Sequence, residues 1–161
     1  MLMSVCSRYE KNKDDALAVL NQGFLKILNN LGQFQEGKPF EPWIKRIMIN
    51  VCIDEFRKSK NYRQHTRHTD FEMEAPIEAA VEWNDAEKFI TDESLEHMLR
   101  QLPPVSGQVF NLYAIDGLKH KEIADLLKIS EGTSKWHLSH ARQLLKKMLK
   151  AIGSHAQMMV L

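Results

Sequence analysis

At 161 residues, the chain is long enough to form one domain or two small ones. Its apolar and charged fractions are those of an ordinary globular protein, and no apolar run approaches the ~20 residues of a membrane-spanning helix. The formal net charge of +1 indicates neither a basic nor an acidic partner by itself.

The first sixty residues predict two amphipathic helices. Residues 14–31 begin with Asp14 and Asp15, which suit a first helical turn, and apolar residues then recur at three- and four-residue spacing. The expected buried stripe of this helix is Ala16, Leu20, Phe24, Ile27, Leu28 and Leu31. After a loop with Gly37 and Pro39, residues 41–59 form the second helix. Its expected stripe is Trp43, Ile44, Ile47, Met48, Val51 and Phe56.

Residues 61–91 differ from the helices on either side. They have few aliphatic residues, no glycine and an acidic excess, which predicts a flexible acidic linker. Residues 1–60 carry ten basic and seven acidic residues, residues 61–100 carry four and ten, and residues 101–161 carry eight and four. Two basic ends therefore flank an acidic middle.

The second half again has helical periodicity. We expect helices at 92–101, 105–115 and 119–127, followed by a long helix that begins at Glu131. Pro103 and Pro104 separate the first two, because the residue before a proline disfavours the helical region. No β pattern occurs. The predicted fold is all-α, with two small helical domains at 1–60 and 92–153, the linker between them, and a tail at 154–161.

The last two helices predict a helix-turn-helix. Gly117 suits a left-handed cap before the first of them, and Ser130 is a good N-cap for the second. The expected buried stripe of the last helix is Leu138, Ala141, Leu144, Leu145 and Met148. The residues expected to face outward, toward DNA bases, are Thr133, Ser134, Lys135, Trp136, His137, Ser139, His140 and Arg142. The alternative is a helical hairpin with a solvated polar face.

Two segments resemble one family. Residues 102–147 resemble the C-terminal domain of extracytoplasmic-function (ECF) sigma factors, and residues 36–60 resemble the promoter-melting half of the same proteins. The matching motifs of the first segment are Leu102-Pro103-Pro104, Phe110-Asn111-Leu112, Asp116-Gly117, Glu122-Ile123-Ala124, Ile129-Ser130-Glu131-Gly132-Thr133 and Ala141-Arg142. Those of the second are Phe40, Trp43, Arg46, Ile47, Asn50, Asp54 and Arg57. Two matches in the family's order are more specific than one helix-turn-helix.

The resemblance implies a dissociable subunit of bacterial RNA polymerase that recognises promoters and initiates transcription. It implies contacts to the minus-thirty-five element from Thr133, Lys135, Trp136, His137, Ser139, His140 and Arg142. For the melted minus-ten element the implied residues are Phe40, Trp43, Arg46, Asn50, Arg57 and Lys58. Contacts to the polymerase clamp helices are expected from Asn21, Gln22, Phe24 and Lys26. The other implied partners are the polymerase flap and an anti-sigma factor, and the linker is expected to run toward the RNA exit path.

The chain departs from the family pattern at several positions. Ala18 and Asn21-Gln22 stand where an acidic residue and Gln-Glu are usual, so neutral groups replace expected charges in clamp binding. Lys128 occupies a turn position that often holds glycine, and Trp136 and His140 replace smaller or more basic residues. We expect the opening helix that usually precedes MLMSVCSRY in the family to be absent, either because the start is truncated or because the N-terminal domain has fewer helices.

Other chemistry is not predicted. The pairs His65/His68 and His137/His140 lack the further ligands that tetrahedral zinc requires, and no nucleophile–base set or phosphate-binding glycine loop occurs. We therefore expect no metal, no cofactor and no enzyme activity. Cys6 and Cys52 are expected to be buried, reduced and unpaired. The start lacks the apolar core of a signal peptide, so a cytoplasmic location is expected. The alternative functions are a stand-alone helix-turn-helix regulator and a degenerate sigma factor acting through another protein.

Overall fold

The computed structural model describes residues 1–10, 12–58 and 97–158, with side chains to residue 150. These residues form helices and loops without a β-strand, which confirms the predicted all-α class. The chain divides into two compact units, Met1–Thr66 and Arg67–Leu161, which are described separately. The predicted linker and the pair His65/His68 lie outside the described residues.

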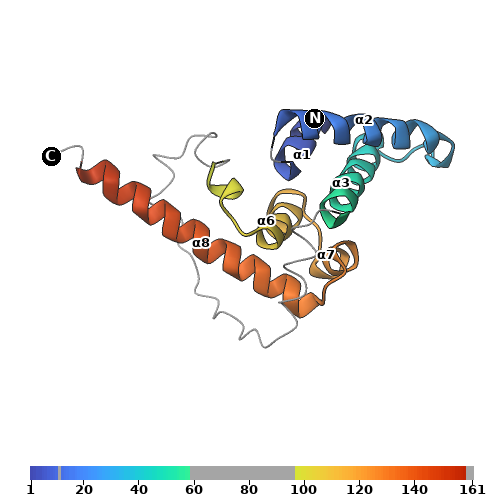
Figure 1. Ribbon diagram of the computed structural model, residues 1–161. Helices are drawn as coiled ribbons and strands as arrows, with labels where there is room; N and C mark the ends of the chain where they lie inside the picture. Colours follow the sequence, from blue (N-terminus) through green and yellow to red (C-terminus); the bar gives the residue numbers. More distant parts are fainter. Residues whose placement is uncertain (11, 59–96, 159–161) are drawn as a thin grey trace. The chain divides into compact units, whose positions relative to one another are not determined.

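The described residues of the first unit form three α-helices that each pack against the other two (Figure 1). They are α1 (Leu2–Tyr9), α2 (Lys13–Asn29) and α3 (Phe40–Lys58), with a short 3-10 turn, η1 (Leu31–Gln33), after α2. The Asn12 side chain caps α2 by accepting the Asp15 backbone N–H at 2.8 Å.

The buried face of α2 matches the prediction only in part, because Ala16 and Ile27 are buried as predicted whereas Val19 and Gly23 were not predicted. It consists of Ala16, Val19, Gly23 and Ile27. The side chains of Phe24, Leu28 and Leu31 are 55%, 48% and 44% exposed, so their prediction as core residues was wrong. The physical reason is a close approach between α2 and α3: a Cβ atom at Gly23 would lie 2.3 Å from the Met48 sulfur. This contact turns the glycine side of α2 inward and leaves the larger apolar residues outside.

Helix α3 is buried on more than one side because α1 and α2 both pack on it. Its buried residues are Met48, Ile49, Val51, Cys52 and Ile53. Of the predicted stripe, only Met48 and Val51 are fully inside. Cys6 of α1 and Cys52 of α3 are both buried and unpaired, as predicted.

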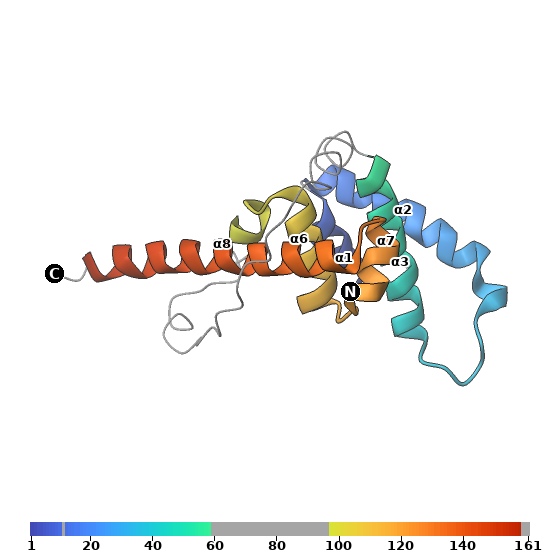
Figure 2. The same cartoon turned by 90° about the horizontal axis from the view of Figure 1, so that it is seen from below.

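The second unit is built along one long helix (Figure 2). Residues 97–100 are helical, and α6 (Pro104–Phe110), α7 (His120–Leu127) and α8 (Glu131–Met158) follow. A core cluster confirms the predicted inner side of α8; it consists of Met98, Leu102, Ala141 and Leu145, with Leu99, Phe110, Leu144, Met148 and Leu149 packed against it. Because α8 continues to Met158, it runs into the segment predicted as a tail.

The predicted helix 105–115 is present, but its second part has π-helical instead of α-helical geometry. After α6, residues Asn111–Ile115 form a π-helical turn, η2, in which the Asp116 N–H donates to the Asn111 carbonyl at 2.9 Å. Gly117 ends the turn with a φ of 73°, and the Leu118 N–H donates to the Leu112 carbonyl at 2.9 Å. None of the helices in the described part of the chain has the length and apolar character needed to cross a membrane.

Candidate nucleic-acid interface

The second unit contains a helix-turn-helix made of α7, a turn at residues 128–130, and α8. Lys128 ends α7 in the left-handed region, with φ of 56° and ψ of 43°. The Ser130 hydroxyl accepts the Thr133 backbone N–H at 2.9 Å, so Ser130 caps α8 as predicted. Ile123 and Leu127 are fully buried and Ala124 is nearly so, and these residues form the inward face of α7.

One polar row on α8 is open to solvent. Lys135, Ser139, Arg142 and Lys146 follow one another at four-, three- and four-residue spacing, which places them on one face of the helix. Lys135 is exposed and the other three are half-buried. This row gives the helix a cationic side that also carries a hydroxyl donor.

Two residues predicted to face outward lie inside instead. The exposed fraction is 0% for Ser134 and 6% for His137. Their spacing explains this, because Ser134 and His137 each lie four residues before a residue of the buried stripe. The prediction of outward orientation was wrong at these positions because polarity was given more weight than spacing.

Each of these buried side chains makes a hydrogen bond, although His137 Nε2 is buried without a partner. Ser134 Oγ lies 2.9 Å from His120 Nδ1, and His137 Nδ1 lies 2.9 Å from Ser106 Oγ on α6. Burial lowers the pKa of His137 to about 4, with a smaller contribution from His140. His137 is therefore neutral at physiological pH and belongs to the packing between α6 and α8.

Trp136 and His140 form a pair of stacked aromatic rings on α8. Their ring centroids are 4.7 Å apart in a stacked arrangement. His140 Nδ1 also lies 3.4 Å from Ser106 Oγ, so the pair is tied to α6. In the described part of the chain no three His, Cys, Asp or Glu residues are grouped to hold a metal ion.

Arg142 lies over an aromatic ring that the sequence analysis did not identify. Its guanidinium carbon is 5.8 Å from the centroid of the Tyr113 ring. Tyr113 in turn stacks on His120, with centroids 4.6 Å apart. These residues come from η2, α7 and α8, and no local spacing in the sequence brings them together.

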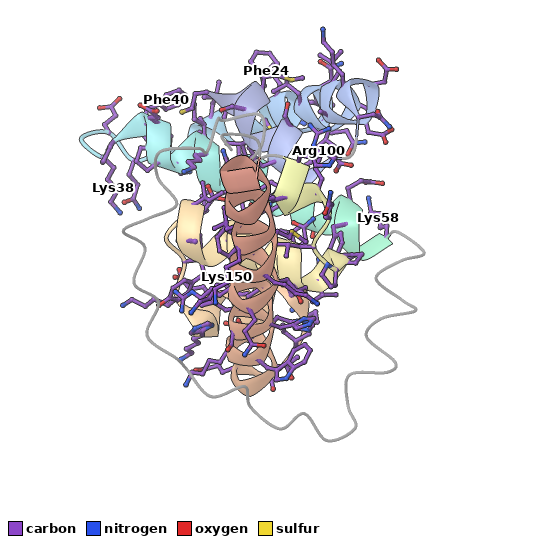
Figure 3. All side chains as sticks on the ribbon, turned by 90° about the vertical axis from the view of Figure 1, so that its left-hand side faces the viewer. Phe24, Lys38, Phe40, Lys58, Arg100 and Lys150 are labelled. Atoms are coloured by element: carbon purple, nitrogen blue, oxygen red, sulfur yellow. The ribbon has the colours of Figure 1, made fainter. Side chains whose placement is uncertain are left out.

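In the first unit, aromatic rings gather where α3 begins. Phe34, Phe40 and Trp43 have ring centroids 5.2 to 5.7 Å apart. Phe40 is 45% exposed, and it reaches the surface of this unit (Figure 3). Beyond the rings, Arg46 and Asn50 continue on the Trp43 side of the helix at three- and four-residue spacing.

The cations near the other end of α3 have acidic partners. Arg57 forms an ion pair with Asp54, which also lies 3.7 Å from the Lys26 ammonium. The Lys58 ammonium lies 3.2 Å from the Glu55 carboxylate. The predicted nucleic-acid contacts Arg57 and Lys58 are therefore partly neutralised within their own helix.

The solvent-exposed side of α2 carries both polar and apolar residues. Asn21, Gln22 and Lys26 are exposed beside Phe24, which points to the surface in Figure 3. Exposed leucines that the prediction missed or placed in the core extend this surface; they are Leu17, Leu25, Leu28 and Leu31. The adjacent apolar pairs Phe24-Leu25 and Ile27-Leu28 are the signal in the sequence, because one buried face cannot hold both members of each pair.

Two family models match separate parts of the chain. Sigma-70 region 2 matches residues 1–62, and sigma-70 region 4 matches residues 92–145. Together they cover more than two thirds of the chain, and they correspond to the first unit and to the helix-turn-helix unit.

Known proteins match over most of their length. The chain is 23% identical to the ECF RNA polymerase sigma factor SigW of Bacillus subtilis, over 92% of this chain and 83% of that protein. It is 27% identical to the RNA polymerase sigma factor SigV of the same organism, over 88% and 80%. Among solved structures, the sigma factor RpoE of Bartonella quintana, in complex with the anti-sigma factor NepR, matches with a TM-score of 0.58 and 18% identity, over 92% and 89%.

Proposed function

The chain belongs to the ECF group of the sigma-70 family and directs RNA polymerase in transcription initiation, and from that premise we propose how its two units divide the work. The first unit binds the polymerase clamp and holds the melted minus-ten strand, and the second reads the minus-thirty-five element. The protein acts in the cytoplasm as a non-catalytic subunit of the holoenzyme.

The open row on α8 supports the minus-thirty-five assignment and is the observation that carries the proposal. Lys135, Ser139 and Arg142 present donors from the first turns of a recognition helix, where side chains reach base edges and phosphates. Thr133, Trp136 and His140, which flank this row, are the further proposed contacts. His137 is excluded from direct contact because it is buried.

The aromatic cluster at the start of α3 supports the minus-ten assignment. A base that leaves the duplex loses its stacking, and an exposed ring replaces that interaction. Phe40 and Trp43 supply rings, while Arg46 and Asn50 supply donors beyond them. Arg57 and Lys58 contribute through the phosphate backbone, with strength reduced by their acidic neighbours.

The outer side of α2 supports clamp binding. Asn21, Gln22 and Lys26 offer polar contacts, and Phe24 with its neighbouring leucines offers apolar area that a partner can bury. An apolar surface compensates for the charges that the family usually carries there. An anti-sigma factor that covers the same surface would exclude polymerase by competition.

Reconstitution tests the proposal. The purified chain is mixed with core polymerase, the complex is isolated, and genomic fragments that it retains are sequenced and transcribed in run-off assays. We expect stable core binding and transcripts that start downstream of the retained sites. Promoter binding without polymerase would instead indicate a stand-alone regulator, and failure to bind core would indicate action through another protein.

The α2 assignment has its own test. Phe24→Ala and Leu28→Ala should weaken core binding by about tenfold each without lowering the melting temperature, because both side chains are half exposed. Leu17→Ala probes the beginning of the same surface. Retention of full core affinity in all three variants would contradict the assignment.

A further inference from the structure

The guanidinium group of Arg142 on α8 lies over the ring of Tyr113, which belongs to η2. The guanidinium carbon lies 5.8 Å from the Tyr113 centroid, within the distance at which a cation is attracted to the face of an aromatic ring. Tyr113 is 36% exposed, so this contact forms at the protein surface beside the open row of α8.

The ring of Tyr113 also contacts a residue of α7. It stacks on His120 with centroids 4.6 Å apart and an angle of 23° between the planes. His120 Nδ1 lies 2.9 Å from the hydroxyl of Ser134, which is fully buried in α8. Through His120 and Tyr113, these contacts connect Ser134 to Arg142, which lies two helical turns further along α8.

The π-helical turn explains how Tyr113 reaches this place. A single π turn changes the direction of the residues that follow it in a helix. Here it lies between the buried end of α6 and Gly117, and Leu112 remains fully buried while its neighbour Tyr113 turns to the surface.

An arginine side chain that is free in solution loses rotamer freedom when it binds, and a side chain already held in place loses less. We propose that Tyr113 is a positioning residue that pre-organises Arg142 for promoter DNA, with His120 and Ser134 as its support. This inference rests on the proposed reading of the minus-thirty-five element by α8.

A double-mutant cycle in the reconstituted holoenzyme tests the inference. The variants are Tyr113→Leu, Arg142→Ala and the pair together, and the probe is the genomic fragment that the wild-type holoenzyme retains most strongly. Arg142→Ala should lower affinity by about fivefold or more. Tyr113→Leu should lower it by about two- to fivefold, and it should have no further effect when Arg142 is already alanine.

Two other variants separate positioning from stability. Tyr113→Phe keeps the ring and should restore affinity to the wild-type range. Ile115→Ala changes another exposed residue of the same π turn, 40% exposed, and should leave affinity unchanged. If Tyr113→Leu lowers the melting temperature, Tyr113→Met replaces it in the cycle.

The outcomes also separate this inference from the proposed function. A wild-type holoenzyme that retains no fragment would overturn the proposed function and the inference with it. Retention by the wild type with no loss in Arg142→Ala would leave the function standing and overturn the positioning role. Equal losses from Tyr113→Leu in both backgrounds would also overturn it, because the ring would then act independently of Arg142.

Discussion

Lys128 carries the backbone conformation on which the turn of the helix-turn-helix depends. Its φ of 56° lies in the left-handed region, where a side chain with a Cβ is strained and glycine is not. Lys128→Gly should therefore raise the free energy of unfolding of the second unit by about 1 kcal/mol. Urea unfolding followed by circular dichroism measures the change.

Lys121→Gly is the matched control for this substitution. Lys121 is an exposed lysine in the first turn of α7, where glycine has a lower helix propensity than lysine. The two variants should move stability in opposite directions. A loss of stability in Lys128→Gly as well would show that the lysine side chain has a compensating interaction.

Glu10 makes the first unit sensitive to pH. The pKa of its carboxyl is raised from 4.5 to about 7, chiefly by burial and to a smaller extent by the negative charges of Asp15 and Glu55. The stability gained from the protonated form is fully present below pH 4.5 and is lost as the pH rises through 7. Because Glu10 remains partly exposed, we expect a loss of about 1 kcal/mol.

The variant Glu10→Gln should remove this dependence. The free energy of unfolding of the first unit is measured from pH 4.5 to 8. Between pH 5 and 7.5 it should fall for the wild type and stay level for Glu10→Gln. Glu36→Gln, in the exposed loop before α3, should keep the wild-type slope. An identical slope in Glu10→Gln would refute the role of this carboxyl.

At the scale of elements, α2 and α3 approach each other closely at Gly23. Gly23→Ala would place a methyl group 2.3 Å from the Met48 sulfur, so the fully buried Met48 side chain would have to shift. Overpacking should outweigh the gain in helix propensity, so we expect a loss of about 1–2 kcal/mol. Thermal unfolding of the variant measures it.

Gly32 offers a control, because no atom lies within 4 Å of a Cβ built there. Gly32→Ala should change the melting temperature little. Combining Gly23→Ala with Met48→Val should recover part of the loss from the first substitution, since the shorter side chain makes room for the methyl group. Simple additivity of the two losses would mean that α2 and α3 separate instead of repacking.

The helices were predictable from local signals, and their faces only in part. Ser130 as a cap, Gly117 as a left-handed residue and the α8 stripe all follow from neighbours along the chain. The inward face of α2 did not, because Gly23 has no side chain to count in an apolar pattern. Only the position of Met48, 25 residues later, shows why glycine lies inside.

The recognition surface was predictable as a helix but not as a set of contacts. Ser134 and His137 were placed outside because they are polar, whereas in the fold they are buried and each makes one hydrogen bond, to His120 and Ser106. Tyr113 was missed because its position depends on a π turn, and no residue type in that turn is specific for this geometry.

At the scale of the whole molecule, charge is distributed unevenly although the net charge is only +1. Residues 101–161 carry eight basic and four acidic residues, and several of the basic ones lie along α8. Each phosphate contact releases counterions, so promoter affinity of the holoenzyme should fall steeply as salt is raised. A salt titration of wild type and Lys135→Ala measures this.

Lys135→Ala should weaken binding by about 1–3 kcal/mol and relax the preference at one base position if Lys135 contacts a base. If it contacts a phosphate, affinity should fall uniformly across sequences and the salt slope should decrease by about one. A salt-independent affinity in the wild type would contradict the electrostatic part of the proposal.

The burial of both native thiols has a practical consequence for spectroscopy. Cys6 and Cys52 have an exposed fraction of 0%, and thiol-reactive dyes require an accessible thiolate. A cysteine introduced at an exposed site outside the proposed contacts, such as Gln143→Cys on α8, can therefore be labelled selectively without removing the native cysteines. With a fluorescent donor at this position and an acceptor on the promoter, the approach of α8 to DNA can be followed in time. The protein used keeps both native cysteines in its hydrophobic core.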